Sequence, residues 1–234
     1  MTSDKQDGEN NIPESARFDL ASVFLHAPLY AILDTAAGSA APAEAAVEAL
    51  LRAGVRVMQY RHKEPFRSAQ VDACAVLARK IREAGGVFFV NDRADVADLS
   101  GADGVHLGQD DLPPEKARRF LGQAPLIGYS THTLEQARLA AAAPVDYIAI
   151  GPVFPTQTKK NPDPVVGLSL VSQVRSLTNK PLVAIGGITM ENAPSVLAAG
   201  ADAVAVIRGL PAGPDLEERA RQFLAALKAG SGRP

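Results

Sequence analysis

The sequence predicts an α/β protein with one (β/α)8 TIM barrel, and three observations support this. Eight short apolar runs rich in valine and isoleucine alternate with longer, alanine-rich segments. The 234 residues come close to the roughly 250 that one such barrel needs. No linker-like stretch interrupts the pattern after residue 28. We therefore expect a flexible N-terminal extension over residues 1–27 and a barrel domain over residues 28–230.

The apolar runs are too short for helices and lack strict alternation, as is typical of buried parallel strands. The predicted strands are Leu29–Leu33, Val55–Gln59, Val87–Val90, Gly104–Leu107, Leu126–Gly128, Tyr147–Ile150, Leu182–Ile185 and Ala203–Ile207. An open doubly wound sheet is the alternative. It would usually carry a G-x-G-x-x-G turn after an early strand, whereas the first strand here continues into Asp34.

Helices are predicted between the strands, where apolar residues recur at spacings of three and four. The clearest are Ala43–Ala53, Ser68–Ala84, Leu134–Ala142 and Glu191–Ala199. Glycine follows three of them, as expected at a helix C-terminus. Cys74 falls within the second helix and is expected to be a small buried apolar residue.

Composition excludes several classes of protein. A formal net charge of −2 argues against a nucleic-acid partner. No run of about 18 apolar residues predicts a membrane span, and the polar N-terminus has no signal-peptide core. A single cysteine forbids an intrachain disulfide and suits a cytoplasmic location. Self-association into a homo-oligomer stays open, as does packing of Phe18, Leu20, Phe24 and Leu25 on the barrel.

Polar residues gather after the predicted strands, whose carboxyl ends share one face of a barrel and form its active site. The second strand leads into Gln59, Arg61 and Lys63, whose side chains point to one side of an extended chain. Arginine and lysine together form a plausible clamp for a phosphate group. A solvated charged strand end is the alternative.

Carboxylates follow two adjacent strands, with Asp92 after the third and Asp110 and Asp111 after the fourth. Hard oxygen ligands of this kind suit Mg²⁺, which completes its shell with substrate phosphate and water. Taken alone, capping of the next helix is the commoner use of such aspartates. His106 lies within a strand run and is expected to be packed and hydrogen-bonded.

Hydroxyl groups follow the fifth and sixth strands. Ser130 could donate to a substrate oxygen or cap the next helix, a role for which Thr133 competes. The connection after the sixth strand is long for a barrel and carries Thr156, Thr158 and Lys159. Long loops in compact domains are usually functional or disordered, so both an anion-binding loop and a flexible surface loop stay open.

The strongest physical signal lies after the last two strands. The seventh strand leads into Gly186-Gly187 and the eighth into Ile207-Arg208. Glycines here let backbone N–H groups approach a ligand, and many barrels bind phosphate at this position. Together with the clamp after the second strand, this predicts two anion sites in one mouth, for two phosphorylated substrates or one long one.

Several ordered motifs after residue 28 resemble those of thiamine-phosphate synthases: QYRHK, FFVNDRADVA, GADGVHLGQDDL, IGYSTHTLEQA, DYIAIGPVFPTQTK and PLVAIGGI. The resemblance implies a Mg²⁺-dependent transferase that joins hydroxymethylpyrimidine diphosphate to thiazole phosphate and releases pyrophosphate. It implies no general base, because the thiazole nitrogen has a lone pair and no proton to lose.

The resemblance also implies roles for individual residues. Pyrimidine diphosphate contacts are implied for Gln59, Arg61, Lys63, Asn91, Ser130 and Lys159. Thiazole phosphate contacts are implied for Thr156, Thr158, Gly187, Ile207 and Arg208. Metal ligation is implied for Asp92 and Asp111. The family usually has serine where Arg208 stands, so only the backbone contact at this position carries over directly.

Three other functions compete with this one. A thiazole tautomerase would share the fold and the phosphate site, and His132 has a counterpart there, but it would lack the clamp and the metal carboxylates. A non-catalytic barrel would bind thiazole phosphate without turnover. A sugar-phosphate isomerase would need a free general base at the mouth, for which Asp34 is the one candidate.

Overall fold

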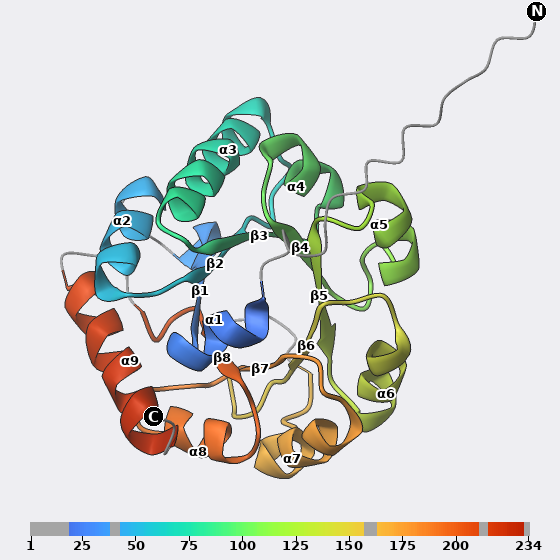
Figure 1. Cartoon of the computed structure of the whole chain (residues 1–234), viewed down its shortest axis with the longest axis vertical. Helices are drawn as coiled ribbons and strands as arrows, with labels where there is room; N and C mark the ends of the chain where they lie inside the picture. The colour runs from blue at the N-terminus through green and yellow to red at the C-terminus, as the bar shows by residue number, and fades with distance from the viewer. Residues whose placement is uncertain (1–18, 38–42, 157–162, 211–214, 232–234) are drawn as a thin grey trace, which may run out of the picture.

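The eight strands form one closed parallel barrel, in which each strand pairs with its neighbour in chain order and β8 pairs with β1. The computed structural model describes residues 19–37, 43–156, 163–210 and 215–231. Figure 1 looks along the barrel and shows the helices arranged around the ring of strands. The predicted (β/α)8 fold is confirmed.

The strands are β1 (Leu29–Asp34), β2 (Val57–Arg61), β3 (Val87–Asn91), β4 (Gly104–Leu107), β5 (Leu126–Thr131), β6 (Tyr147–Ile150), β7 (Leu182–Ile185) and β8 (Ala203–Val206). The helices in the described ranges are α1 (Leu20–His26), α2 (Ala43–Ala53), α3 (Ser68–Glu83), α4 (Ala94–Ser100), α5 (Pro114–Leu121), α6 (Leu134–Ala142), α7 (Gly167–Leu177), α8 (Ala193–Ala198) and α9 (Leu216–Ser231), with the 3-10 helix η2 (Thr35–Ala37). No helix in these ranges could cross a membrane, since none is both long and apolar enough.

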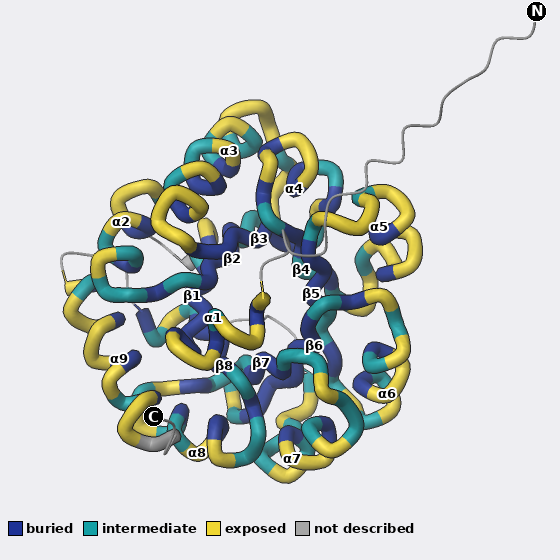
Figure 2. The backbone as a smooth tube through the Cα atoms, in the orientation of Figure 1, coloured by how far each residue is buried: buried dark blue, intermediate teal, exposed yellow. Residues whose placement is uncertain are grey.

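Alternate strand residues face opposite sides, which produces two hydrophobic cores. One lies inside the barrel around Tyr30, Phe89 and Tyr147, and the other lies between the strands and the helices. Figure 2 shows buried strands and helices exposed on their outer faces. Glycine is required beside the inner rings, because a Cβ at Gly104 would lie 2.7 Å from the Phe89 ring and one at Gly128 would lie 2.1 Å from the Tyr147 ring.

Helix α1 covers the end of the barrel where the strands begin, and Figure 1 shows it across the centre of the ring. Its apolar side chains Leu20 and Phe24 are buried with Val57 and Val87, the first residues of β2 and β3. Asp19 begins the helix by accepting hydrogen bonds from the next backbone N–H groups.

The expected flexible extension over residues 1–27 is therefore wrong for residues 19–27. Two apolar side chains one helical turn apart can be buried at the open end of the barrel. The polar average composition of the N-terminal segment gave no sign of this packing. The packing alternative holds for Leu20 and Phe24, whereas Leu25 is exposed. Phe18 lies outside the described residues.

Three aspartates fasten the same end of the barrel, and we call them the aspartate clamps. Asp103, Asp146 and Asp202 each precede an even-numbered strand and bond to the strand before it. Asp146 donates its N–H to the Ile127 carbonyl and accepts the Ile127 N–H on its carboxylate, at 2.7 Å in both directions. Each clamp therefore ties a strand to its neighbour twice.

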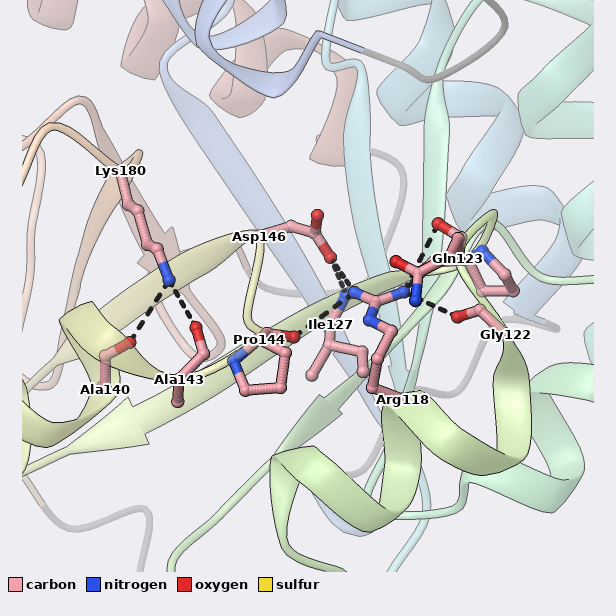
Figure 3. Close-up of polar contacts among 10 residues, drawn as sticks. Arg118, Gly122, Gln123, Ile127, Ala140, Ala143, Pro144, Asp146 and Lys180 are labelled. Carbon is pink, nitrogen blue, oxygen red and sulfur yellow. Dashed lines mark hydrogen bonds and ion pairs between the residues drawn. The ribbon is translucent and has the colours of Figure 1, made fainter. Parts of the chain in front are cut away.

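An arginine completes each clamp and comes from the helix before the first strand of the pair: Arg82 on α3, Arg118 on α5 or Arg175 on α7. Arg118 is buried, and its Nη2 donates to Asp146 Oδ2 at 2.6 Å. Its Nη1 donates to the Gly122 carbonyl at 3.0 Å, so that one guanidinium joins the end of α5 to β6 (Figure 3). Because the ion pair is enclosed and multiply hydrogen-bonded, loss of one partner would be costly.

Candidate active site

A cavity of about 480 Å³ opens among the residues at the carboxyl ends of the strands. Every predicted site residue that the structure describes lines it: Gln59, Arg61, Lys63, Asn91, Asp92, Asp111, Ser130, Thr156, Gly187, Ile207 and Arg208. Thr158 and Lys159 lie outside the described residues.

Arg61 is held at the cavity wall by a carboxylate on the next strand. Asp34 and Arg61 are register partners at the ends of β1 and β2, and Arg61 Nη1 is ion-paired with Asp34 Oδ2. The Asp34 side chain is 3% exposed, and its Oδ1 accepts the Ala36 N–H at 2.9 Å. Asp34 is therefore a partner for Arg61 and is not a free general base.

Lys63 joins the end of β2 to the end of β3. Its Nζ lies 2.5 Å from Asp92 Oδ2. Asp92 is the one non-glycine residue with positive φ among those described, at 64°. Aspartate tolerates this left-handed conformation better than most residues, and here it directs the carboxylate into the cavity lining rather than onto a helix.

Neither Asp92 nor Asp111 caps a helix. The N-cap residues of α4 and α5 are Arg93 and Pro113, and Asp111 Oδ2 accepts the Gly108 N–H at 2.7 Å. Burial raises the pKa of Asp111, the Gly108 hydrogen bond opposes this, and the neighbouring Asp92 carboxylate raises the pKa again. The Asp92 carboxylate thus disfavours the charge on Asp111, and a bound cation would offset this repulsion.

Asp92 and Asp111 offer only two carboxylates as ligands for a metal ion. In the described part of the chain no group of three or more histidine, cysteine, aspartate or glutamate side chains could hold a metal ion. Two carboxylates match Mg²⁺, which takes few protein ligands and retains oxygen ligands from substrate and water.

Asn91 carries an unused donor inside the protein. The residue is 5% exposed, and its Nδ2 is the one buried side-chain nitrogen or oxygen in the described ranges that lacks a hydrogen-bond partner. An unpaired buried donor costs about 1–3 kcal/mol. Because Asn91 lines the cavity, a ligand acceptor would satisfy it.

Ser130 is not a helix cap, since Thr133 begins α6 and accepts the Gln136 N–H at 3.1 Å. The Ser130 hydroxyl instead lies 2.8 Å from His106 Nε2. His106 Nδ1 lies 2.7 Å from the Tyr147 hydroxyl. His106 is hydrogen-bonded as predicted, and it also lines the cavity.

The end of β7 requires two glycines. Gly186 and Gly187 have φ of 97° and 65°, and a Cβ at Gly187 would lie 2.5 Å from the Pro155 carbonyl oxygen. The residues after β6 therefore pack directly against the backbone after β7, which brings Thr156 to the cavity. Arg208, exposed after β8, adds a cation to this side.

Among the cavity residues that the sequence interpretation missed are Tyr30, Tyr147 and Ile32. All three lie in apolar strand runs, where they count as core. Tyr30 and Tyr147 bond to each other at 3.1 Å. Their hydroxyl groups at inward-facing strand positions are the signal that could have revealed them.

Known proteins match this chain over most of its length. A family profile described as thiamine monophosphate synthase matches residues 29–210. A thiamine-phosphate synthase from Koribacter versatilis (strain Ellin345) is 47% identical over 203 residues, covering 85% of this chain and 95% of that protein. One from Lawsonia intracellularis is 39% identical over 203 residues, covering 87% and 94%.

A solved structure agrees in fold and sequence. The thiamine phosphate pyrophosphorylase from Pyrococcus furiosus superposes with a TM-score of 0.81 at 32% identity, covering 90% of this chain and 100% of that one. Together with the cavity and the family profile, these similarities show that this chain belongs to the thiamine-phosphate synthase family.

Proposed function

We propose that this chain joins 4-amino-2-methyl-5-hydroxymethylpyrimidine diphosphate to thiazole phosphate, with Mg²⁺, to give thiamine phosphate and pyrophosphate. The condensation itself follows from the family. One observation carries the assignment to this site: a single cavity is lined by the cations Arg61 and Lys63 and also by Gly187 beside Arg208. Two phosphorylated substrates need two such anion-binding regions.

The residues divide between the substrates. We assign the diphosphate to Arg61 and Lys63, with Ser130 as a further donor. The unused Asn91 Nδ2 matches a ring-nitrogen acceptor of an aminopyrimidine, and Gln59 lies on the neighbouring strand. Thiazole phosphate is assigned to Thr156, Gly187, Ile207 and Arg208. Thr158 and Lys159 stay predictions from the sequence.

Asp92 and Asp111 fit Mg²⁺ by the chemistry of their donors, because both offer hard carboxylate oxygens and Asp92 disfavours the charge on Asp111. When bound there, Mg²⁺ would neutralise negative charge on the departing pyrophosphate. Lys63 lies beside Asp92 and contributes a second positive charge to the same region.

The chemistry asks for positioning rather than proton transfer. The bond between the methylene carbon and the diphosphate oxygen breaks, and the electron pair leaves with pyrophosphate. The thiazole nitrogen forms the new bond to that carbon with its lone pair and loses no proton. Arg61 and Lys63 stabilise the leaving group electrostatically, and holding both substrates in one cavity supplies the remaining rate enhancement.

The alternative functions find less support. A sugar-phosphate isomerase needs a free base, and Asp34 is ion-paired with Arg61. A tautomerase or a non-catalytic barrel that binds thiazole phosphate has no diphosphate to bind, so it would not need Arg61, Lys63 and the carboxylate pair. Both nevertheless stay as outcomes of the test below.

The test is a direct assay of purified protein with both substrates, with and without Mg²⁺, that detects thiamine phosphate and pyrophosphate. We expect equal amounts of both products, formed only with Mg²⁺. Product formed at full rate in a chelator would contradict the metal assignment. Binding of thiazole phosphate without any product would favour the non-catalytic barrel.

The metal assignment has its own variant. We expect Asp92→Asn to raise the Mg²⁺ concentration needed for half-maximal rate, because a neutral amide is a weaker ligand than a carboxylate. Asp95→Asn is the matched control, since the Asp95 side chain is half-exposed and paired with Arg93. An unchanged Mg²⁺ dependence in Asp92→Asn would contradict its role as a ligand.

A further inference from the structure

A chain of five hydrogen-bonded side chains crosses the inside of the barrel, and we call it the barrel relay. Gln59 Nε2 donates to the Tyr30 hydroxyl at 2.9 Å, which lies 3.1 Å from the Tyr147 hydroxyl. His106 follows, with Nδ1 at 2.7 Å from Tyr147 and Nε2 at 2.8 Å from Ser130 Oγ. All five residues line the cavity.

The order of protons along the relay is set at its first member. An amide nitrogen can only donate, so Tyr30 accepts from Gln59. If Tyr147 also donated to Tyr30, the Tyr30 hydroxyl proton would be left without an acceptor in the relay. Tyr30 is 1% exposed, and an unsatisfied buried donor is unfavourable. Tyr30 therefore donates to Tyr147.

The remaining protons follow in sequence. Tyr147 accepts from Tyr30 and so donates to His106 Nδ1. A neutral imidazole that accepts at Nδ1 carries its proton at Nε2. His106 Nε2 then donates to Ser130 Oγ, which leaves the Ser130 hydroxyl proton to donate elsewhere. Burial raises the pKa of both tyrosines, so both remain neutral donors at ordinary pH.

We propose that Tyr30, Tyr147 and His106 are positioning residues, which make Ser130 a hydrogen-bond donor toward the diphosphate substrate and leave Gln59 Oε1 as an acceptor. This rests on the proposed function, which places the pyrimidine diphosphate between the two ends of the relay. A diphosphate oxygen can only accept from Ser130, and an exocyclic amino group can donate to Gln59. The relay thus matches donors and acceptors to the substrate before it binds.

The first test measures the histidine tautomer by ¹⁵N NMR of the full chain, with the His106 signals identified by their loss in His106→Gln. We expect a neutral ring protonated at Nε2. Tyr147→Phe removes the donor to Nδ1 and should shift the tautomer population toward Nδ1–H. Tyr60→Phe is the matched control, because Tyr60 is a buried strand tyrosine in the core between the strands and the helices. A native ring protonated at Nδ1 would overturn the relay.

The second test separates positioning from support of the fold. His106→Gln keeps a donor near Ser130, whereas His106→Asn is too short to reach it. We expect His106→Asn to raise the KM for the pyrimidine diphosphate roughly tenfold, with the KM for thiazole phosphate unchanged, and His106→Gln to stay within a few-fold of the native protein. Equal losses in both variants, or equal effects on both KM values, would reduce the relay to a structural role.

The proposed function and the proton order of the relay can be tested separately. If the unsubstituted protein forms no thiamine phosphate, the proposed function fails. The tautomer measurement needs no substrate, so it supports or overturns the proton order in either case.

Discussion

Arg61 illustrates how one residue can be prepared for an anion before the anion arrives. The guanidinium has five N–H donors, and Asp34 accepts from only one of its nitrogens, Nη1. Among the described residues no other hydrogen bond to this guanidinium is found, so its remaining donors can serve a ligand at the cavity wall. Because the Asp34 carboxylate is buried, it fixes the position of Arg61 and limits the entropy lost when a phosphate group binds.

This arrangement predicts the effect of Arg61→Ala. We expect the KM for the pyrimidine diphosphate to rise roughly 10- to 100-fold, the range for loss of a charge-assisted hydrogen bond. The KM for thiazole phosphate should change little. Steady-state kinetics with each substrate varied in turn would measure both.

Two controls accompany Arg61→Ala. Arg93→Ala removes an exposed cation that is paired with Asp95, and it should leave both KM values unchanged. The double variant Asp34→Asn, Arg61→Ala avoids an unpaired buried carboxylate, so it separates loss of binding from loss of stability. Equal increases in both KM values would argue against a role for Arg61 that is specific to the diphosphate substrate.

The sequence allowed us to predict which residues line the cavity where polar side chains follow apolar strands, as with Gln59, Arg61 and Asp92. The cavity position of Tyr30 and Tyr147 was not predictable. A tyrosine in an apolar run fits a core position equally well, and only barrel closure brings the two hydroxyl groups to hydrogen-bonding distance.

At the scale of elements, the aspartate clamps fix how neighbouring strands align. Each ties an even-numbered strand to the strand before it and to an arginine on a helix. In the corresponding position before β2 stands Arg56, which donates to the Leu51 and Val55 carbonyls instead. The first two strands are therefore held together without an aspartate clamp.

The clamp around Arg118 can be tested for stability. We expect Arg118→Ala to lower the free energy of unfolding by about 3 kcal/mol or more, because it leaves Asp146 without its enclosed partner. Arg119→Ala, one residue on and exposed, should change it by less than about 0.5 kcal/mol. Urea denaturation of both variants would measure the free energy of unfolding. Similar values for the two would show that the ion pair of Arg118 with Asp146 adds no more stability than an exposed arginine.

Most elements were predictable from periodicity, and their errors have physical causes. α2 and α6 begin and end where predicted. β5 continues to Thr131 beyond the predicted Gly128, because Ser130 and Thr131 are polar but bonded inside the fold. α1 was not predicted, since its apolar side chains are few and its partner surface exists only after the barrel closes.

In the whole molecule, substrate binding and stability depend on opposite ends of the barrel. Binding residues gather where the strands end, while α1 and the aspartate clamps lie where the strands begin. Between them the rings of Tyr30, Phe89 and Tyr147 fill the interior. Changes at the closed end should therefore alter stability without altering substrate binding.

Phe24→Ala tests this separation. Phe24 is 0% exposed, and truncating such a side chain costs about 3–5 kcal/mol. We expect that loss in the free energy of unfolding, with both KM values unchanged. Leu25→Ala, on the exposed side of the same helix, should leave stability within about 0.5 kcal/mol. A large change in either KM value would show that the two ends are coupled.

The aspartate clamps also bear on the order in which the chain folds. Arginine and aspartate are separated by 21, 28 and 27 residues in the three clamps, whereas the seam of the ring joins Leu29 to Val204. Contacts between nearby segments form at a smaller entropic cost than contacts between distant ones. Three fastened segments can thus assemble early and independently, which leaves the meeting of β1 with β8 as the late step that completes the ring.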